Sequence, residues 1–151
     1  MKFWDTSAVV PLCVNEPRSA GVRAVLVEDP SIVVWWPTRT ECVSAFMRQI
    51  RDRSLHAGGE RQARHVLQTL ARAWTEIQPN EVLRGTAERL LAVHSLTAAD
   101  AFQLAAALQW CQRETQDMSF VTFDDRLPPI RRALLFRLTI RTDIPSIVRP
   151  L

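Results

Sequence analysis

The sequence contains very few lysines and glycines, and this scarcity excludes several phosphate-handling folds. Only Lys2 is a lysine among the 19 basic residues, whereas a phosphoacceptor receiver domain needs a lysine at the end of a later strand. Of the four glycines only Gly58 and Gly59 are neighbours, so the glycine patterns of P-loop and dinucleotide-binding sites are missing. A haloacid-type phosphatase would need Asp-x-Asp after the first strand, and Asp5 is followed by Thr-Ser instead.

Paired cysteines and long apolar segments are missing too. The three cysteines, Cys13, Cys42 and Cys111, are odd in number, widely spaced and without a C-x-x-C pair, which argues against a disulfide framework or a zinc site. We expect buried, reduced thiols. No apolar run is long enough to span a membrane, and Met1 leads into the first strand without the segments of a signal peptide. These features predict a cytoplasmic protein with no membrane association.

The overall composition is that of one globular domain. With 151 residues, 47% of them hydrophobic and 23% charged, the chain is long enough for one hydrophobic core, and we expect a single domain over residues 1–151. The net charge is only +3, and arginine supplies nearly all of the positive side. Arginine suits bidentate phosphate recognition. The same bias can reflect the base composition of a genome, so it does not by itself assign a ligand.

Alternating strand and helix patterns predict an α/β fold. Three apolar segments are typical of buried strands: Phe3–Trp4, Ser31–Trp36 and Met118–Phe123. They are apolar without alternation, as expected for parallel strands covered on both faces. Helical patterns lie between them, so the predicted fold is a three-layer α/β/α sandwich around a mostly parallel sheet. Further strands are expected within 74–78 and 137–141, followed by an irregular tail.

The helices are placed by their caps and apolar faces. We expect helices that begin at Asn15, Thr38 and Asn80, one that follows a loop over residues 54–59, and a nearly all-apolar, buried helix within 95–110. The helix after the loop and the helix after Asn80 are expected to form an antiparallel hairpin. The inward residues of the second of these helices are predicted to be Val82, Leu83, Ala87, Leu90 and Leu91.

Four acidic residues occupy one kind of position in this fold. Asp5 and Asp124 directly follow predicted strands, whereas Glu41 and Asp100 lie in the first turns of helices. In a parallel sheet the carboxyl ends of the strands share one edge, so the four carboxylates can converge there. The alternative is local, because Glu41 and Asp100 each follow a threonine by three residues, which is the spacing of a capping box.

If the four acids converge, a metal ion is expected to bind between them. Carboxylates packed together raise one another's pKa, and a hard divalent cation such as Mg²⁺ or Mn²⁺ relieves that repulsion. Such an ion lowers the pKa of a bound water and neutralises charge on the leaving oxygen of a phosphodiester. With these acids set aside, the rest of the chain is more basic, and a basic surface around an acidic site suits a nuclease.

Four motifs occur in order along almost the whole chain. They are Asp5-Thr-Ser-Ala at the end of the first strand, Thr40-Glu41 before an apolar helix, Asp100-Ala-x-x-Leu-Ala in the buried helix, and the segment from Phe120 to Leu127 around Asp124. Together they resemble the PIN domain, in particular the VapC-type toxins of bacterial toxin and antitoxin pairs. The resemblance implies a three-layer α/β/α fold and an Mg²⁺-dependent endoribonuclease, with Mn²⁺ able to substitute.

The resemblance also implies roles for individual residues. Asp5 and Asp100 match the metal ligands, and Glu41 and Asp124 complete the acidic quartet, although Asp125 can substitute for Asp124. The small hydroxyl residues that support the site are matched by Thr6, Ser7 and Thr122. These hydroxyls can instead be ordinary turn and cap groups.

Two departures from the family pattern stand close to the site. Gln103 occupies a position where many relatives have histidine, and Pro128-Pro129 interrupts a helix that relatives usually begin with alanine. Candidate RNA contacts are Arg48 and Arg51, which lie off the apolar face of the helix that begins at Thr38; a solvated charged face is the other explanation for them.

The resemblance implies several partners. They are an RNA substrate, a small antitoxin bound along the groove between the early and middle helices, and a second copy of the chain in a homodimer. The main alternative is a catalytically inactive PIN-fold module that holds RNA or a protein partner. A hydrolytic triad is not indicated, because the three histidines lie in a loop and on helices without a nucleophile nearby in the sequence.

Overall fold

The computed structural model describes residues 1–111, 119–123 and 148–150. Two helices follow each of the first three strands, so helices lie between the strands as the sequence predicts. The strands are β1 (Lys2–Trp4), β2 (Ile32–Trp35), β3 (Thr75–Ile77), β4 (Ser119–Val121) and β5 (Val148–Pro150). The helices are α1 (Thr6–Cys13), α2 (Ser19–Glu28), α3 (Thr38–Arg51), α4 (Ala57–Ala71), α5 (Glu81–Val93) and α6 (Ala98–Cys111).

The sheet is mostly parallel, as predicted. Its strand order is β3-β2-β1-β4-β5, with parallel pairing between the first four strands and antiparallel pairing of β5 with β4. In this register Phe3 lies opposite both Val33 and Phe120. The carboxyl ends of β1, β2 and β4 therefore meet at one edge, where the acidic residues were expected.

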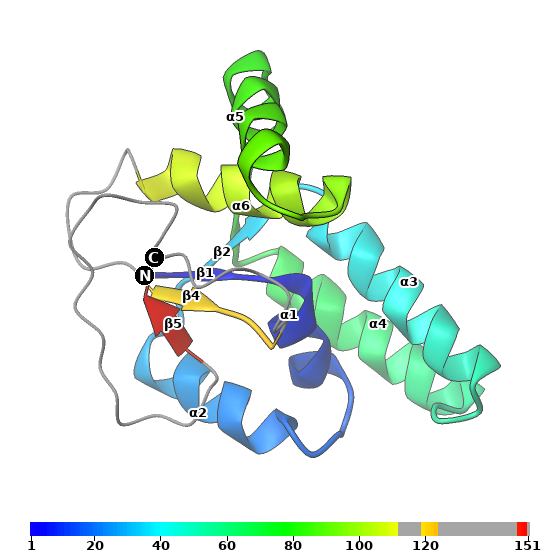
Figure 1. The fold of residues 1–151 in the computed structure, drawn as a ribbon. Helices are drawn as coiled ribbons and strands as arrows, with labels where there is room; N and C mark the ends of the chain where they lie inside the picture. Colours follow the sequence, from blue (N-terminus) through cyan, green and yellow to red (C-terminus); the bar gives the residue numbers. More distant parts are fainter. Residues whose placement is uncertain (112–118, 124–147, 151) are drawn as a thin grey trace.

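Helices cover both faces of the sheet (Figure 1). On one face Phe3, Val33 and Ile77 pack with residues of α5 and α6. On the other face Trp4 and Val34 pack with residues of α1, α2, α3 and α4. Neighbouring residues of one strand thus belong to different cores, because successive side chains point to opposite faces. This arrangement confirms the predicted three-layer α/β/α sandwich.

Two predicted boundaries differ from the structure. α2 begins at Ser19 and not at Asn15, because the Ser19 hydroxyl accepts from the amide of Glu16 (3.0 Å) and donates to the carbonyl of Val14 (2.8 Å), which holds a turn before the helix. α4 begins inside the predicted loop, at Ala57. Its amino terminus is capped by the His56 ring, whose Nδ1 accepts from the amide of Gly59 at 3.0 Å.

The predicted hairpin of α4 and α5 is wrong. β3 separates the two helices, α4 packs beside α3 on one face of the sheet, and α5 packs along α6 on the other (Figure 1). Leu83, Ala87 and Leu90 of α5 are buried as predicted, but Val82 and Leu91 are 71% and 41% exposed. The helix packs mainly along α6 and buries only the stripe formed by Leu83, Ala87 and Leu90.

The cysteines are free thiols, as predicted, whereas the end of the chain differs from the prediction. Cys13 and Cys42 are buried free thiols and Cys111 is half-buried, and burial raises the pKa of Cys13 and Cys111 to about 12. The tail expected to be irregular contains β5. The strand predicted within 137–141, the acids Asp124 and Asp125 and the Pro128-Pro129 pair lie outside the described residues. Among the helices of the described part, none is both long and apolar enough to cross a membrane.

Candidate active site

Asp5 lies at the junction between β1 and α1, where the parallel strands end. Its backbone amide donates to the carbonyl of Val121 in the neighbouring strand β4 at 3.0 Å. Its side chain caps α1 by accepting from the amide of Ser7 at 3.3 Å. The residue is only 8% exposed, so its carboxylate is held below the surface at the edge of the sheet.

Two hydroxyl groups bind the same oxygen of this carboxylate. Ser7 Oγ donates to Asp5 Oδ2 at 2.5 Å, and Thr122 Oγ1 donates to it at 3.0 Å. The backbone amide of Phe123 in turn donates to Ser7 Oγ at 2.9 Å. These bonds fix the orientation of the Asp5 carboxyl group. They also attach Thr122 and Phe123, which lie between β4 and Asp124 in the sequence, to the first turn of α1.

Glu41 lies in the first turn of α3 but does not form the predicted capping box. Residue Pro37 occupies the cap position, and no side chain caps this helix. The carboxylate of Glu41 instead accepts a hydrogen bond from the hydroxyl of Thr6, which belongs to α1. Glu41 therefore faces the end of β1, and its place is set by a residue far away in the sequence.

Asp100 does form the predicted capping box at the start of α6. Its Oδ2 accepts from the hydroxyl of Thr97 at 2.8 Å and from the amide of Thr97 at 3.4 Å. The amide of Asp100 donates back to Thr97 Oγ1 at 3.2 Å. The carboxylate is half-buried, and its charge reaches Glu41, whose pKa it helps to raise. A capping role and a place in the acidic site are thus compatible here.

The acids at this edge lack cationic partners in the described part of the chain. Burial raises the pKa of Asp5, and the hydrogen bonds from Ser7 and Thr122 offset only part of this effect. Burial also raises the pKa of Glu41, as do the charges of Asp5 and Asp100, while the Thr6 hydroxyl lowers it. None of the ion pairs between described residues includes any of these three acids.

The donor set fits a hard divalent cation. Carboxylate oxygens are the ligands that Mg²⁺ and Mn²⁺ prefer, and a cation would relieve the cost of the buried, unpaired charge on Asp5. Within residues 1–111, 119–123 and 148–150, no three acids, histidines or cysteines lie close enough to form a complete metal site. Asp124, the fourth predicted acid, falls outside these ranges.

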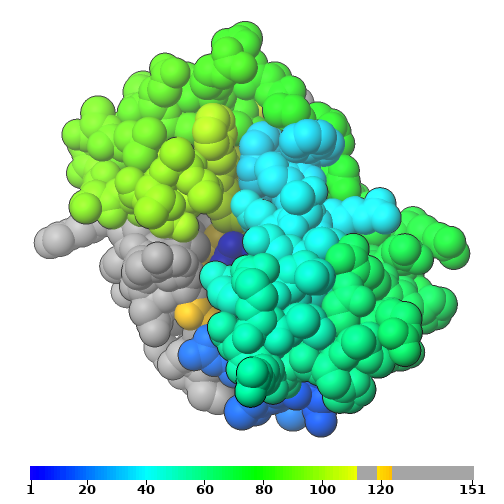
Figure 2. Space-filling model, turned by 90° about the vertical axis from the view of Figure 1, so that its right-hand side faces the viewer, coloured from blue at the N-terminus to red at the C-terminus, as the bar shows by residue number. Residues whose placement is uncertain are grey.

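The acidic edge opens into a cleft. Figure 2 shows the first residues of the chain, in dark blue, at the bottom of a depression between α3, in cyan, and α6, in yellow-green. Glu41 comes from the first of these helices and Asp100 from the second. The two helices that border the depression therefore each carry an acid in their first turn, and Asp5 directly follows β1.

Comparison with known families identifies the fold. A family model described as the PIN domain matches residues 2–133. The chain belongs to the PIN domain family. The resemblance found in the sequence motifs is thereby confirmed at the level of the family, and the match extends over all four predicted acids, including Asp124.

A solved structure shares the fold. VapC20 of Mycobacterium tuberculosis, described as a toxin that cleaves the sarcin-ricin loop, superposes with a TM-score of 0.58 at 16% sequence identity. The similarity covers 73% of this chain and 83% of that chain. A search of curated proteins finds no significant match.

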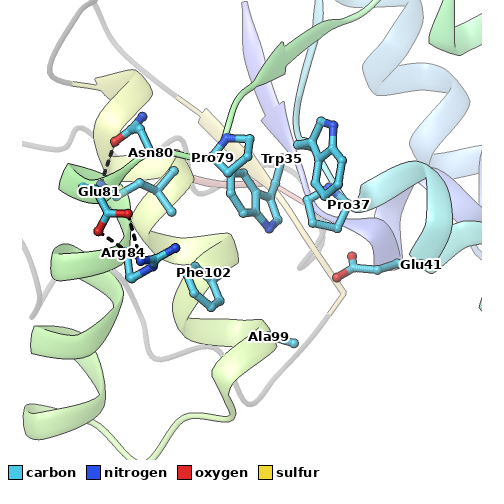
Figure 3. A pocket seen from close by; sticks show the side chains of 11 residues that line it. Trp35, Pro37, Glu41, Pro79, Asn80, Glu81, Arg84, Ala99 and Phe102 are labelled. Carbon is cyan, nitrogen blue, oxygen red and sulfur yellow. Dashed lines mark hydrogen bonds and ion pairs between the residues drawn. The ribbon is translucent and has the colours of Figure 1, made fainter.

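The PIN domain carries a pocket beside its acidic edge, with a volume of about 380 Å³ (Figure 3). Glu41 lies at one side of it, and Arg84 with its partner Glu81 lies at the other. Trp35 and Phe102 stack in its wall with their ring centroids 6.1 Å apart. No local sequence pattern predicts this pocket, since its walls come from separate parts of the chain.

Trp36 also lines the pocket, and its predicted position is wrong. It was predicted to belong to a buried strand, but β2 ends at Trp35 and the side chain of Trp36 is 53% exposed. The chain turns at Pro37 into α3, so Trp36 stands beyond the last covered residue of the strand. The signal in the sequence was its position, a tryptophan at the carboxyl end of a strand and directly before a proline.

The predicted RNA contacts lie some distance from the acids. Arg48 and Arg51 are exposed in the last turns of α3, and at 1.5 Å per residue they lie roughly 10–15 Å along the helix axis from Glu41. Another arginine, not predicted, lies nearer the end of β4. The guanidinium carbon of Arg18 sits 4.5 Å from the centre of the Phe123 ring, in a cation–π contact. No local spacing predicts this contact, because it depends on how α2 packs under the sheet.

Gln103 lies buried beneath the site. Its side-chain amide nitrogen is 3.5 Å from the carbonyl of Trp4, the residue before Asp5. Its Oε1 has no hydrogen-bond partner among the described residues. In this chain the position where many relatives have histidine thus contacts the backbone at the end of β1.

Proposed function

We propose that this chain is a divalent-metal-dependent endoribonuclease that hydrolyses RNA phosphodiester bonds at the cleft between α3 and α6. The observation that carries the proposal is the grouping of Asp5, Glu41 and Asp100 at one edge of the sheet without a cationic partner in the described part. Membership of the PIN family supports it, as does the fold shared with VapC20, an RNA-cleaving toxin.

Each acid has a role in the proposed reaction. Asp5 and Asp100 hold Mg²⁺, with Glu41 and Asp124 as further acidic groups and Asp125 as the substitute for the fourth. When bound, the ion supplies an activated water and neutralises charge on the leaving oxygen. Glu41, whose pKa is raised by burial and by the neighbouring acids, is suited to accept a proton from the attacking water.

The hydroxyl residues position these acids. Ser7 and Thr122 fix the carboxyl group of Asp5, and Thr6 holds that of Glu41. Hydrogen bonds of this kind keep a carboxylate in its working orientation before the substrate arrives. Arg48 and Arg51 remain candidate contacts for the flanking RNA backbone.

The partners follow from the same proposal. The chain acts as the toxin of a toxin–antitoxin pair in the cytoplasm, a small antitoxin covers the cleft, and the toxin forms a homodimer. The second candidate function is a PIN-fold module that binds RNA or a protein without cleaving it. It is favoured by the complete capping box of Asp100, because this box gives the acid a structural reason to be present.

Cleavage of a labelled total RNA pool tests the proposal. We expect discrete cuts by the wild-type chain with Mn²⁺, none with chelator, and none by Asp100→Asn, whose side-chain oxygen still accepts from Thr97. Glu88→Gln, which changes an exposed acid of α5, is the matched control and should cleave normally. If wild type and Asp100→Asn give the same pattern, the cutting is contamination and the binding module is the better explanation.

A further inference from the structure

The pocket beside Glu41 offers aromatic surface. Trp36 lines it with 53% of its surface exposed, and Trp35 and Phe102, which also line it, are stacked almost parallel, with 11° between their planes. A volume of about 380 Å³ is at the small end of the range for ligand sites. A pocket of this size and lining suits one flat ring system.

The polar side chains of the pocket are already engaged within the protein. Asn80 caps α5 by accepting from the amide of Leu83 at 2.9 Å, and its nitrogen donates to Gln109 at 3.0 Å. Arg84 forms an ion pair with Glu81 at 2.8 Å (Figure 3). Arg84 is the only cation among the described residues that line the pocket, and it is neutralised by Glu81. With Glu41 in the opposite wall, the described lining therefore disfavours a phosphate group.

The pocket and the acidic site share a wall. Glu41 belongs to both, and Ala99, which lines the pocket, directly precedes Asp100. A strand of RNA with one phosphate at the acids would therefore bring a neighbouring base to the mouth of the pocket. Bases of single-stranded RNA commonly stack on exposed aromatic side chains.

We propose that this pocket binds a nucleobase next to the scissile phosphodiester, stacked on the indole of Trp36. This inference rests on the proposed nuclease function, since it takes the acids as the place where the phosphate lies. Because Asn80, Glu81 and Arg84 are engaged within the protein, we expect the pocket to read no base edge through them and to accept any base. A purine binds more tightly than a pyrimidine, since its ring system offers a larger stacking surface.

The test compares short labelled oligoribonucleotides of adenine, of uracil, and without bases, bound to the Asp100→Asn chain. Stacking contributes about 1–3 kcal/mol per base, so Trp36→Ala should weaken binding of the adenine oligomer about 5- to 150-fold, since 1.4 kcal/mol is tenfold. It should leave the abasic oligomer unaffected. Trp36→Phe should keep most of the affinity, and Val27→Ala, at an 85% exposed apolar residue outside the pocket, should change nothing.

Three results would overturn the base pocket. In the first, the abasic oligomer binds as tightly as the adenine oligomer. In the second, Trp36→Ala weakens both oligomers equally although its melting temperature is unchanged. In the third, Trp36→Ala leaves RNA binding intact but weakens a complex with a protein partner, which would make an apolar side chain of that partner the occupant.

The cleavage assay separates failure of this inference from failure of the proposed function. Metal-dependent cuts that Asp100→Asn abolishes, together with RNA binding that does not depend on Trp36, would refute the base pocket and leave the nuclease standing. Base-dependent binding through Trp36 in a chain that cuts no RNA would refute the nuclease and leave a PIN-fold RNA-binding module with the same pocket.

Discussion

The hydroxyl of Thr6 donates a hydrogen bond to the carboxylate of Glu41, a residue 35 positions later in the sequence. This contact joins the first turns of α1 and α3 at the carboxyl edge of the sheet. It also replaces the local cap that the sequence around Glu41 predicts. The orientation of Glu41 is thus set by the segment that carries Asp5. Burial is the main cause that raises the pKa of Glu41, and this segment modifies that pKa, since the Thr6 hydroxyl lowers it and the charge of Asp5 raises it.

Thr6→Val should move the acid limb of the pH–rate profile to higher pH. The Thr6 hydroxyl lowers the pKa of Glu41, so its removal raises that pKa further, and the carboxylate needed as a proton acceptor is present only at higher pH. A lost hydrogen bond to a charged group is equivalent to about 1.5–3 kcal/mol, or at least about a tenfold lower rate on the acid side. Thr6→Ser restores the donor and should restore the profile. An unchanged profile in the valine variant would refute the role given to this contact.

Asp5→Asn should raise the melting temperature of the metal-free chain at neutral pH. Burial raises the pKa of Asp5 in the folded chain. Asp5 therefore stabilises the fold below the pKa that it has in the unfolded chain, and this contribution to the free energy of unfolding is lost as the pH rises through the folded-state pKa. Asparagine avoids the cost of the buried charge and keeps an oxygen for the helix cap. The difference in melting temperature between the wild type and Asp5→Asn should therefore shrink toward about pH 4.

Asp29→Asn provides a control of opposite sign for this experiment. Partial burial acts to raise the pKa of Asp29, but its contacts with the amino terminus (2.6 Å) and Lys2 (3.7 Å) lower it on balance. Asp29 therefore stabilises the fold above the pKa that it has in the unfolded chain, and this contribution to the free energy of unfolding is lost as the pH falls through the folded-state pKa. Asp29→Asn should therefore lower the melting temperature at neutral pH. Thermal unfolding in chelator between about pH 4 and pH 8 compares both variants with the wild type.

Mn²⁺ should stabilise the wild-type chain and not Asp5→Asn. A ligand that binds only the folded state adds about 2.7 kcal/mol at a hundred times its Kd, which corresponds to about 5–10 °C in a domain of this size. Thermal unfolding at rising Mn²⁺ concentration measures this effect, with Glu88→Gln as the control that should match the wild type. Equal shifts in wild type and Asp5→Asn would place the ion elsewhere.

The acidic site could be predicted from the sequence as far as local signals reach. An apolar segment that ends in Asp5, and a threonine three residues before Asp100, are short-range patterns, and the structure places both residues as these patterns indicate. Glu41 has the same spacing to a threonine, yet its box does not form. The difference lies in Thr6, which no pattern near Glu41 reveals.

The fold shows the same limit of prediction. Strands β1 and β2 and the buried helix α6 were predicted because their apolar patterns depend on burial alone. Which face of the sheet α4 and α5 cover depends on how the chain crosses the sheet, and a helical pattern contains no such information. Arg18 was missed for this reason, since its contact with Phe123 joins α2 to the end of β4.

Ser7→Ala should destabilise the chain and disturb the site together. The substitution removes a hydroxyl that donates to Asp5 and accepts from the amide of Phe123, so this amide loses its partner. The Phe123 amide is partly buried, so the loss of its partner should cost about 1 kcal/mol, or a few degrees in melting temperature. Ser44→Ala, at an exposed position of α3, should have no effect. Full stability in Ser7→Ala would mean that water replaces the hydroxyl.

Arg18→Ala should weaken RNA binding more strongly than Arg72→Ala. The Arg18 guanidinium is held over Phe123, next to the residues that bind Asp5, whereas Arg72 is exposed at the carboxyl end of α4. Loss of one phosphate contact lowers the slope of log K against log salt by about one, whatever the RNA sequence. Titrating the Asp100→Asn chain with RNA at several salt concentrations measures this slope. Arg18→Lys keeps the charge and should keep the slope; if it behaves like Arg18→Ala, then Arg18 acts by packing on Phe123 and not by binding phosphate.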